Sequence, residues 1–194
     1  STYVNAGQYV KVWRDEQFDL DVAGIEKAVL EHKAKVLFLC SPNNPNGGVI
    51  DDETVQRLLK LPVLVVLDEA YIEFTGDPSR IGWTLAYDNL VVLRTFSKLA
   101  GLAGLRIGYG GFPEWLIPHI MKIKQPYNVT VSADLAARGA LHDQAWLTEK
   151  TSLIITERNR PLERRSNARR TQVITNYGIR PLVAYHYDAL TVFR

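Results

Sequence analysis

Three short apolar runs are the feature that most restricts what this chain can fold into. They cover residues 35–40, 63–67 and 90–94, and nearly every position in them is apolar. Runs of this length and composition are typical of strands that are covered on both faces by other elements. Because helical patterns alternate with the runs, the sequence predicts an α/β fold built on an open, largely parallel sheet flanked by helices.

The segments around these runs predict two further strands and a set of helices. Residues 8–13 and 106–110 have strand patterns. The first helix should bury Ile25, Val29 and Leu30 against the sheet. The expected helices begin at Asp21, at Asp51 or Asp52, at Pro113, near Ser132 and near Gln144.

A polar residue follows each of the three apolar runs. Asn44 lies in the loop after the first run, Asp68 ends the second, and Lys98 follows the third. Parallel strands bring their carboxyl ends to the same edge of a sheet, and ligands bind there in open α/β folds. We therefore expect Asn44, Asp68 and Lys98 to lie close together in a ligand site.

The segment from Thr95 to Arg106 predicts the chemistry of that site. Lys98 follows two hydroxyl residues, Thr95 and Ser97, and precedes a glycine-rich stretch that ends at Arg106. A lysine forms a Schiff base with an aldehyde once its amine is neutral, which burial or a nearby cation such as Arg106 favours. Hydroxyls and an arginine suit a phosphate, and Asp68 suits a pyridinium nitrogen. Together they favour pyridoxal phosphate over a solvated Ser-Lys turn and a surface Asp-Glu pair.

The composition argues against several other classes of protein. No stretch reaches the roughly 18 apolar residues that a membrane span needs, and residues 1–11 lack the pattern of a signal peptide. The single cysteine, Cys40, excludes an intramolecular disulfide and is expected to be a buried, inert thiol in a reducing compartment. The four histidines are scattered, so no metal site is expected.

The basic residues are a mixture of lysines and arginines before residue 157, and only arginines after it. From there to the end of the sequence there are eight arginines, three acidic residues and no lysine, whereas all nine lysines lie at or before Lys150. One interpretation is a segment that binds nucleic acid or another anion. We favour an irregular or non-native C-terminal segment, of the kind that an out-of-frame reading would yield, because residues 161–194 lack a sustained helical or alternating pattern.

Three motifs carry a resemblance to a known family. They are Ser41-Pro42-Asn43-Asn44-Pro45-Asn46-Gly47, Asp68-Glu69-Ala70-Tyr71, and the run from Thr95 through Ser97-Lys98 to Arg106. With these motifs, roughly residues 5–160 resemble the fold-type I pyridoxal-phosphate aminotransferases. Residues 66–74, 93–110 and 124–129 are similar to the subgroup that transfers an amino group between histidinol phosphate and 2-oxoglutarate.

The resemblance implies roles for individual residues. Lys98 would bind pyridoxal phosphate as a Schiff base and move the proton between substrate and cofactor. Asp68 would face the pyridine nitrogen, while Asn44 and Tyr71 would hydrogen-bond the ring hydroxyl, with a cis Asn44–Pro45 bond aiming the amide. The positions that match the family's cofactor-binding residues are Asn44, Asp68, Tyr71, Thr95, Ser97, Lys98 and Arg106.

The resemblance also implies an incomplete enzyme. Residues 1–143 would be part of the large, cofactor-binding domain, and residues 144–194 an interdomain helix with a partial or irregular small domain. The segment that precedes this region in the family, and the arginine that grips the substrate carboxylate, cannot be identified here. The isolated chain is therefore expected to have little activity and to expose apolar sheet surface that favours self-association.

The expected partners are small molecules: an amino-acid-like phosphate, a 2-oxo acid and, in the whole protein, a second copy of the chain. Neither nucleic acid nor a membrane is expected, and the location implied is the cytoplasm, or a plastid for a plant-like source. Two alternatives stay open. One is a different reaction on the same cofactor, such as decarboxylation or elimination. The other is a non-catalytic fragment that binds phosphate-bearing ligands.

Overall fold

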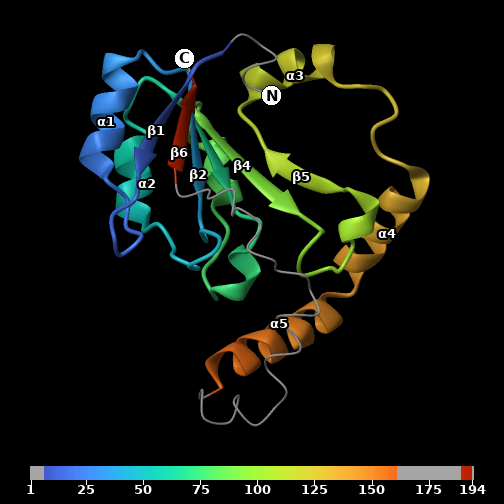
Figure 1. Ribbon diagram of the computed structural model, residues 1–194. Coiled ribbons are helices and arrows are strands. Elements are labelled where there is room, and N and C mark those ends of the chain that lie inside the picture. Colours follow the sequence, from blue (N-terminus) through green and yellow to red (C-terminus); the bar gives the residue numbers. More distant parts are fainter. Residues whose placement is uncertain (1–6, 161–188, 194) are drawn as a thin grey trace.

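The computed structural model describes residues 7–160 and 189–193. Their strands form one six-stranded sheet in the order β1-β6-β2-β3-β4-β5 (Figure 1). The strands β2, β3 and β4 are parallel, β5 runs antiparallel to β4, and β6 runs antiparallel to both β1 and β2. The bounds are β1 (Tyr9–Trp13), β2 (Val36–Cys40), β3 (Leu64–Asp68), β4 (Leu90–Thr95), β5 (Gly108–Gly111) and β6 (Ala189–Phe193). The predicted α/β fold is confirmed, with a mixed sheet whose parallel part is central.

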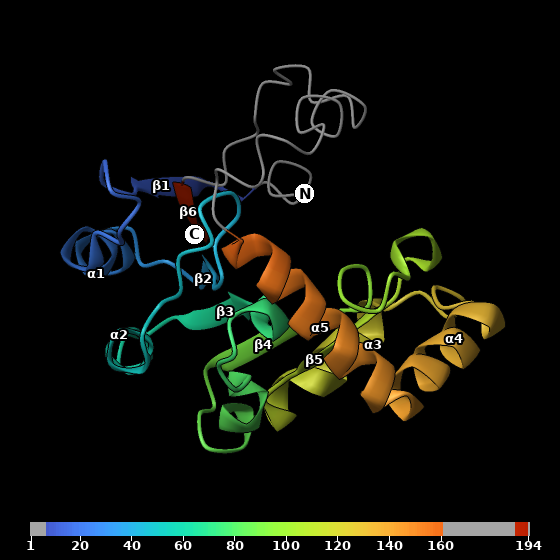
Figure 2. The ribbon, with the colours of Figure 1, turned by 90° about the horizontal axis from the view of Figure 1, so that it is seen from below.

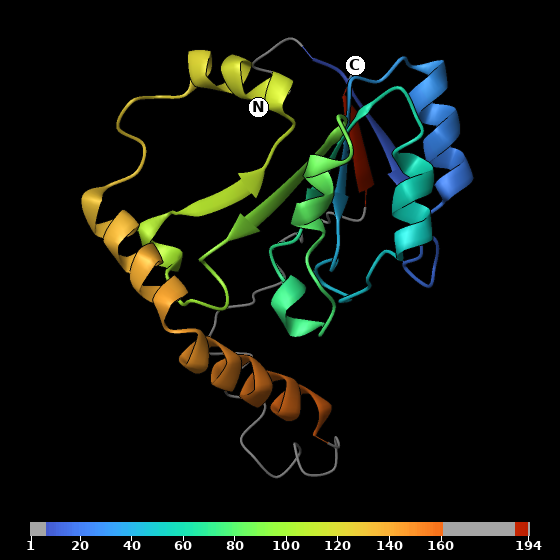
Figure 3. The same ribbon diagram turned by 180° about the vertical axis from the view of Figure 1, so that it is seen from behind.

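Five α-helices accompany the sheet within the described residues. They are α1 (Val22–Glu31), α2 (Asp52–Leu58), α3 (Ile117–Ile123), α4 (Val131–His142) and α5 (Gln144–Asn159). Short 3₁₀ turns lie at η2 (Ile72–Phe74), η3 (Arg80–Leu85), η4 (Ala103–Leu105) and η5 (Glu114–Leu116). Helices α1 and α2 lie on one side of the sheet and α5 on the other (Figure 2), while α4 lies at the opposite end of the molecule from α1 (Figure 3).

Side chains of aspartates fix where the first two helices begin. The Asp21 carboxylate accepts a hydrogen bond from the backbone N–H of Gly24 at 2.8 Å. The Asp51 carboxylate accepts one from the N–H of Thr54 at 2.7 Å, so Asp51, rather than Asp52, caps α2. Each cap satisfies a backbone donor that has no partner within its own helix.

The main apolar core lies between α1, α2 and one face of the central strands. Alternate residues of the strands point into it, since successive side chains of a strand point to opposite faces. Its members include Ile25, Val29, Leu37, Leu39, Val55, Leu58, Val65, Leu67, Leu90 and Val92, all at most 1% exposed. This core holds the parallel strands in register, with Cys40 opposite Asp68 and Asp68 opposite Leu93.

Two expectations about burial are wrong. Leu30 is 58% exposed, because α1 turns it away from the face that carries Ile25 and Val29. Phe38 is 39% exposed, so β2 is not covered on both faces. Phe38 alternates with the buried Leu37 and Leu39, and it therefore lies on the face of the sheet opposite the main core.

The expectation of an irregular segment over residues 161–194 is wrong for its last part. Residues 189–193 form β6, which lies in the sheet between β1 and β2. Leucine, threonine, valine and phenylalanine favour strands, and β6 supplies hydrogen-bonding partners to both neighbours. Residues 161–188 and 194 lie outside the described residues.

Across the described ranges, no helix has both the length and the apolar composition required to cross a bilayer. The same residues contain no group of three or more histidine, cysteine, aspartate or glutamate side chains placed to hold a metal ion.

Candidate functional site

The loops that follow β2, β3 and β4 meet at the carboxyl edge of the sheet. The Asn44 side-chain amide donates to the Tyr71 hydroxyl over a long distance of 3.4 Å. The Lys98 ammonium lies over the Tyr71 ring, 4.8 Å from its centre. Three predicted site residues, one from each loop, are therefore brought together, with Tyr71 between the other two.

The loop that carries Asn44 is held tightly by its own backbone. The Asn43 N–H donates to the Gly48 carbonyl at 2.8 Å, and the Gly47 N–H donates to the Asn43 carbonyl at 2.7 Å. Gly47 adopts a φ of 78°, which is costly for other residues. The Asn44–Pro45 bond is cis, as expected, and so is the Ser41–Pro42 bond.

Asp68 ends β3 with one carboxylate oxygen engaged. Its Oδ1 accepts from the backbone N–H of Ala70 at 3.0 Å, which orients the half-buried side chain. Its Oδ2 makes no hydrogen bond within the part of the chain that the structure describes. Oδ1 thus orients the carboxylate, and Oδ2 can accept a hydrogen bond from a ligand.

Cys40 lies beside Asp68 in the sheet, and the two are paired in register. Burial of the thiol, with a smaller contribution from the negative charge of Asp68, raises the pKa of Cys40 to about 11. The thiol is therefore protonated near neutral pH, and the structure gives it no role as a nucleophile.

Thr95 and Ser97 form a hydroxyl turn at the end of β4. The Thr95 hydroxyl accepts from the Ser97 backbone N–H at 3.0 Å, and both side chains are half-buried. Lys98, the next residue, is exposed, so the burial that we expected around its amine is not found among the described residues.

Arg106 lies near this turn but is engaged locally. The Phe96 N–H donates to the Ile107 carbonyl at 3.3 Å, which brings the chain after Arg106 back to the turn. The Arg106 guanidinium donates to the Ala103 carbonyl at 2.9 Å. Within the described residues no contact joins Arg106 to Thr95 or Ser97, so the predicted phosphate set is brought together only in part.

Two cavities border these residues. One, of about 210 Å³, is lined by Asn44, Tyr71 and Phe74 among others, and by Arg158 of α5. The Arg158 guanidinium donates to the Phe74 carbonyl at 2.8 Å. Sequence reasoning missed Arg158, since no local pattern shows that the end of α5 returns to the loop after β3.

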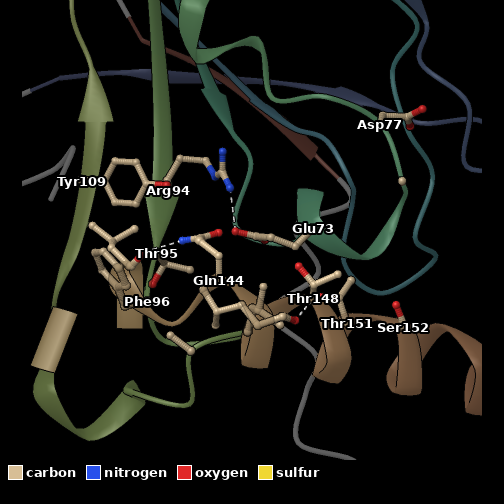
Figure 4. Close-up of a pocket in the computed structure, with 15 residues that line it drawn as sticks. Glu73, Asp77, Arg94, Thr95, Phe96, Tyr109, Gln144, Thr148, Thr151 and Ser152 are labelled. Atoms are coloured by element: carbon tan, nitrogen blue, oxygen red, sulfur yellow. Dashed lines mark hydrogen bonds and ion pairs between the residues drawn. The ribbon is translucent and has the colours of Figure 1, made fainter. Parts of the chain in front are cut away.

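The second cavity, of about 400 Å³, lies between β4, β5 and α5 (Figure 4). Thr95 lines it beside Arg94, whose guanidinium pairs with Glu73 and faces the ring of Tyr109. The hydroxyls of Thr148, Thr151 and Ser152 line the side formed by α5. Arg94 and Glu73 were also missed, because the pairing of a strand residue with a distant turn has no signal in the sequence.

Most of the chain matches one protein family. Residues 6–176 match the family model described as aminotransferase class I and II, and the chain belongs to that family. The match extends past residue 160, where we expected the resemblance to end.

Relatives within this family cover much of the chain. It is 51% identical over 157 residues to the chloroplastic histidinol-phosphate aminotransferase of Nicotiana plumbaginifolia, covering 81% of this chain and 38% of the relative. It is 52% identical over 151 residues to the histidinol-phosphate aminotransferase of Roseiflexus castenholzii, covering 78% and 40%. The chain thus spans about two fifths of the length of these relatives.

Solved structures show the same fold. The histidinol-phosphate aminotransferase of Clostridium acetobutylicum aligns with a TM-score of 0.71 and 33% identity, covering 77% of this chain and 46% of that one. The enzyme of Sinorhizobium meliloti, solved in complex with pyridoxal-5'-phosphate, aligns with a TM-score of 0.67 and 34% identity, covering 73% and 40%.

Proposed function

We propose that this chain is the cofactor-binding part of a pyridoxal-phosphate aminotransferase that acts on histidinol phosphate and 2-oxoglutarate. Membership of the aminotransferase family supports the reaction class. The substrate is supported by the names of relatives that are about 50% identical to the chain. The observation that carries the proposal is the convergence of Asn44, Tyr71 and Lys98 at the edge of the sheet.

The donor set fits pyridoxal phosphate. Lys98 offers an exposed amine over the ring of Tyr71, and the Tyr71 hydroxyl is bonded by Asn44, which suits an aldehyde next to a ring hydroxyl. Asp68 has an oxygen without a partner in the described structure, which suits a protonated ring nitrogen. The hydroxyls of Thr95 and Ser97 form a turn that suits a phosphate.

Each side chain would then have a distinct task. When bound, pyridoxal phosphate supplies an electron sink for the substrate carbon. The Lys98 amine would hold the aldehyde and then move a proton at Nζ, and the Asp68 carboxylate would keep the ring nitrogen protonated. Asn44 and Tyr71 would orient the ring through its hydroxyl, and the phosphate would be bound by Thr95, Ser97 and Arg106.

The organisation of the whole protein is part of the proposal. We assign residues 1–143 to the large domain and residues 144–194 to the interdomain helix and a partial or irregular small domain, except that residues 189–193 form β6 of the large domain's sheet. The partners would be a small amino-acid-like phosphate, a 2-oxo acid and a second copy of the chain, in the cytoplasm or a plastid. The relatives' names favour amino transfer over decarboxylation or elimination on the same cofactor.

A single-turnover experiment tests the reaction and the substrate. The chain is loaded with pyridoxal phosphate and mixed with histidinol phosphate, with glutamate, or with alanine as a control. Because the isolated chain is expected to have little activity, we expect slow conversion of the cofactor to pyridoxamine phosphate with the first two donors over a long incubation, and much less with alanine. Release of carbon dioxide from glutamate, or no conversion by a loaded chain, would contradict the proposal.

A further inference from the structure

A buried ion network connects the two segments that carry most of the proposed site residues. The Arg94 guanidinium donates to the Glu73 carboxylate at 2.6 Å, and a second nitrogen lies 4.0 Å from the Glu69 carboxylate. The side chain of Arg94 is 12% exposed and that of Glu69 is completely buried. Glu69 is also bound by the backbone N–H of Arg80 at 3.0 Å and by the Ser79 hydroxyl.

The members of this network adjoin the site in sequence. Glu69 directly follows Asp68, and Arg94 directly precedes Thr95. Glu73 lies two residues after Tyr71. A single guanidinium therefore joins the turn after β3 to the end of β4, and Figure 4 shows it between β4 and Glu73.

Stability alone is a weak reason for this arrangement. Removing charges from water costs several kcal/mol per ion, and apolar replacements of buried ion pairs are often neutral or stabilising. What a forked guanidinium adds is geometry, because one nitrogen donates to Glu73 in a fixed direction while a second nitrogen faces Glu69 at an ion-pair distance of 4.0 Å. The main core lies on the other face of the sheet from Asp68. The ladder between β3 and β4 reaches only as far as the Glu69 N–H, which donates to the Leu93 carbonyl at 2.9 Å, so past that point the two turns are joined through Arg94.

We infer that Arg94 is a positioning residue that sets the separation between the Asp68–Tyr71 turn and the Thr95–Lys98 turn. Its role in cofactor binding rests on the proposed function. The spacing of the two turns does not, because it is a property of the chain without ligand. Arg94 itself touches none of the groups assigned to the cofactor; it acts through Glu69 and Glu73.

Hydrogen exchange of the chain without cofactor tests the inference. Two amides report on the turns: that of Ala70, bonded to the Asp68 carboxylate, and that of Ser97, bonded to the Thr95 hydroxyl. We expect Arg94→Met to speed exchange at both amides at least tenfold. Arg80→Met is the matched control, because Arg80 is also a buried arginine and its guanidinium pairs with Asp52 at 2.7 Å. Its bond to Glu69 is made by the backbone N–H, which the substitution keeps.

The Arg80→Met chain should exchange at Ala70 and Ser97 at the wild-type rate. If both methionine variants speed these amides equally, or if neither does, Arg94 has no positioning role. If a methionine variant fails to fold, Arg94→Lys and Arg80→Lys replace the pair, since a lysine keeps the charge but cannot span both carboxylates. The same selective loosening is expected for Arg94→Lys.

Titration with pyridoxal phosphate separates this inference from the proposed function. Arg94→Met should bind the cofactor at least tenfold more weakly than Arg80→Met. A wild-type chain that binds none contradicts the proposed function, while the exchange rates still decide whether Arg94 positions the turns.

Discussion

Among the predicted phosphate ligands, Arg106 has the most constrained backbone conformation. It adopts a φ of 52° in the left-handed region, and its guanidinium donates to the Ala103 carbonyl. This geometry bends the chain back toward the hydroxyl turn of Thr95 and Ser97. An exposed guanidinium there is a fork of donors that a phosphate accepts in pairs.

We expect Arg106→Lys to weaken the binding of pyridoxal phosphate by about 1–3 kcal/mol, the cost of a lost charged hydrogen bond. Arg57→Lys is the control, because Arg57 pairs with Glu26 at 2.7 Å on an exposed surface. Titration followed by absorbance measures both affinities. Equal affinities for the two variants would show that Arg106 is an ordinary surface residue.

Cys40 gives the structure a testable dependence on pH. Its pKa is about 11 in the folded chain, against an ordinary value of 9.0. Below pH 9 both states keep the proton, so the contribution to stability is complete. Between pH 9 and 11 the unfolded chain loses a proton that the folded chain retains, so this stability is lost as the pH rises.

The free energy of unfolding should therefore fall by about 1 kcal/mol more for the wild type than for Cys40→Ala between pH 8 and 10. Urea denaturation at the two pH values gives the difference. Parallel pH dependence of the two chains would mean that the Cys40 thiol ionises in the folded state as readily as in the unfolded one.

At the scale of the elements, the pairing of β4 with β5 depends on glycine. A side chain at Gly110 would place its Cβ 2.7 Å from the Val92 carbonyl of the neighbouring strand. The same strand pair brings the backbone after Arg106 against Thr95, since Gly108 lies opposite Thr95. The glycines of β5 thus allow the close approach that brings this backbone against the hydroxyl turn of Thr95 and Ser97.

Gly110→Ala should reduce the free energy of unfolding by about 1–3 kcal/mol, because backbone atoms must move to relieve the clash. Gly104→Ala is the matched control, since nothing lies within 4 Å of a Cβ at that position. Urea denaturation of both variants measures the costs. A Gly110→Ala chain as stable as the control would mean that β5 does not pair as described.

Sequence patterns predicted the elements well where local chemistry decides them. The apolar runs predicted β2, β3 and β4 within one residue or so at each end, and Asp21 marked the start of α1. The strand ends predicted that Asn44, Asp68 and Lys98 would meet at one edge. Asn44 and Lys98 do come together there, each against Tyr71, which only the family resemblance had pointed to.

Features that depend on partners distant in sequence were not predictable. The exposure of Phe38 depends on which face of β2 the helices cover. A continuous apolar run has the same sequence pattern whether one face or both faces are covered. Strand β6 joins the sheet about 150 residues after β2, where no turn signal relates them. In the sequence, Arg94 is the last residue of an apolar run, and nothing there indicates its pairing with Glu73, which depends on the folded turn after β3.

At the scale of the whole molecule, the described residues of β1 and β2 expose large apolar side chains on the face of the sheet opposite the main core. Tyr9 and Trp13 of β1 and Phe38 of β2 are 37%, 60% and 39% exposed. Clustered apolar exposure of this kind favours association, whereas a single exposed apolar residue does not.

The chain should self-associate with increasing concentration in sedimentation velocity, and Phe38→Lys should reduce the association. Leu85→Lys is the control: Leu85 is 94% exposed but lies in η3, away from this face. The proposal that the sheet face drives association fails if the two variants sediment alike.

The central claim is that the strand-end loops form a pyridoxal-phosphate site with Lys98 as the reactive amine. The most direct measurement is to mix the chain with pyridoxal phosphate, reduce it with borohydride, and locate the adduct by peptide mass. Lys122 and Lys124, near the end of α3, are internal controls for nonspecific labelling. The account predicts one adduct on Lys98 that disappears in Lys98→Arg; labelling of Lys122 or Lys124 with Lys98 unmodified would contradict it.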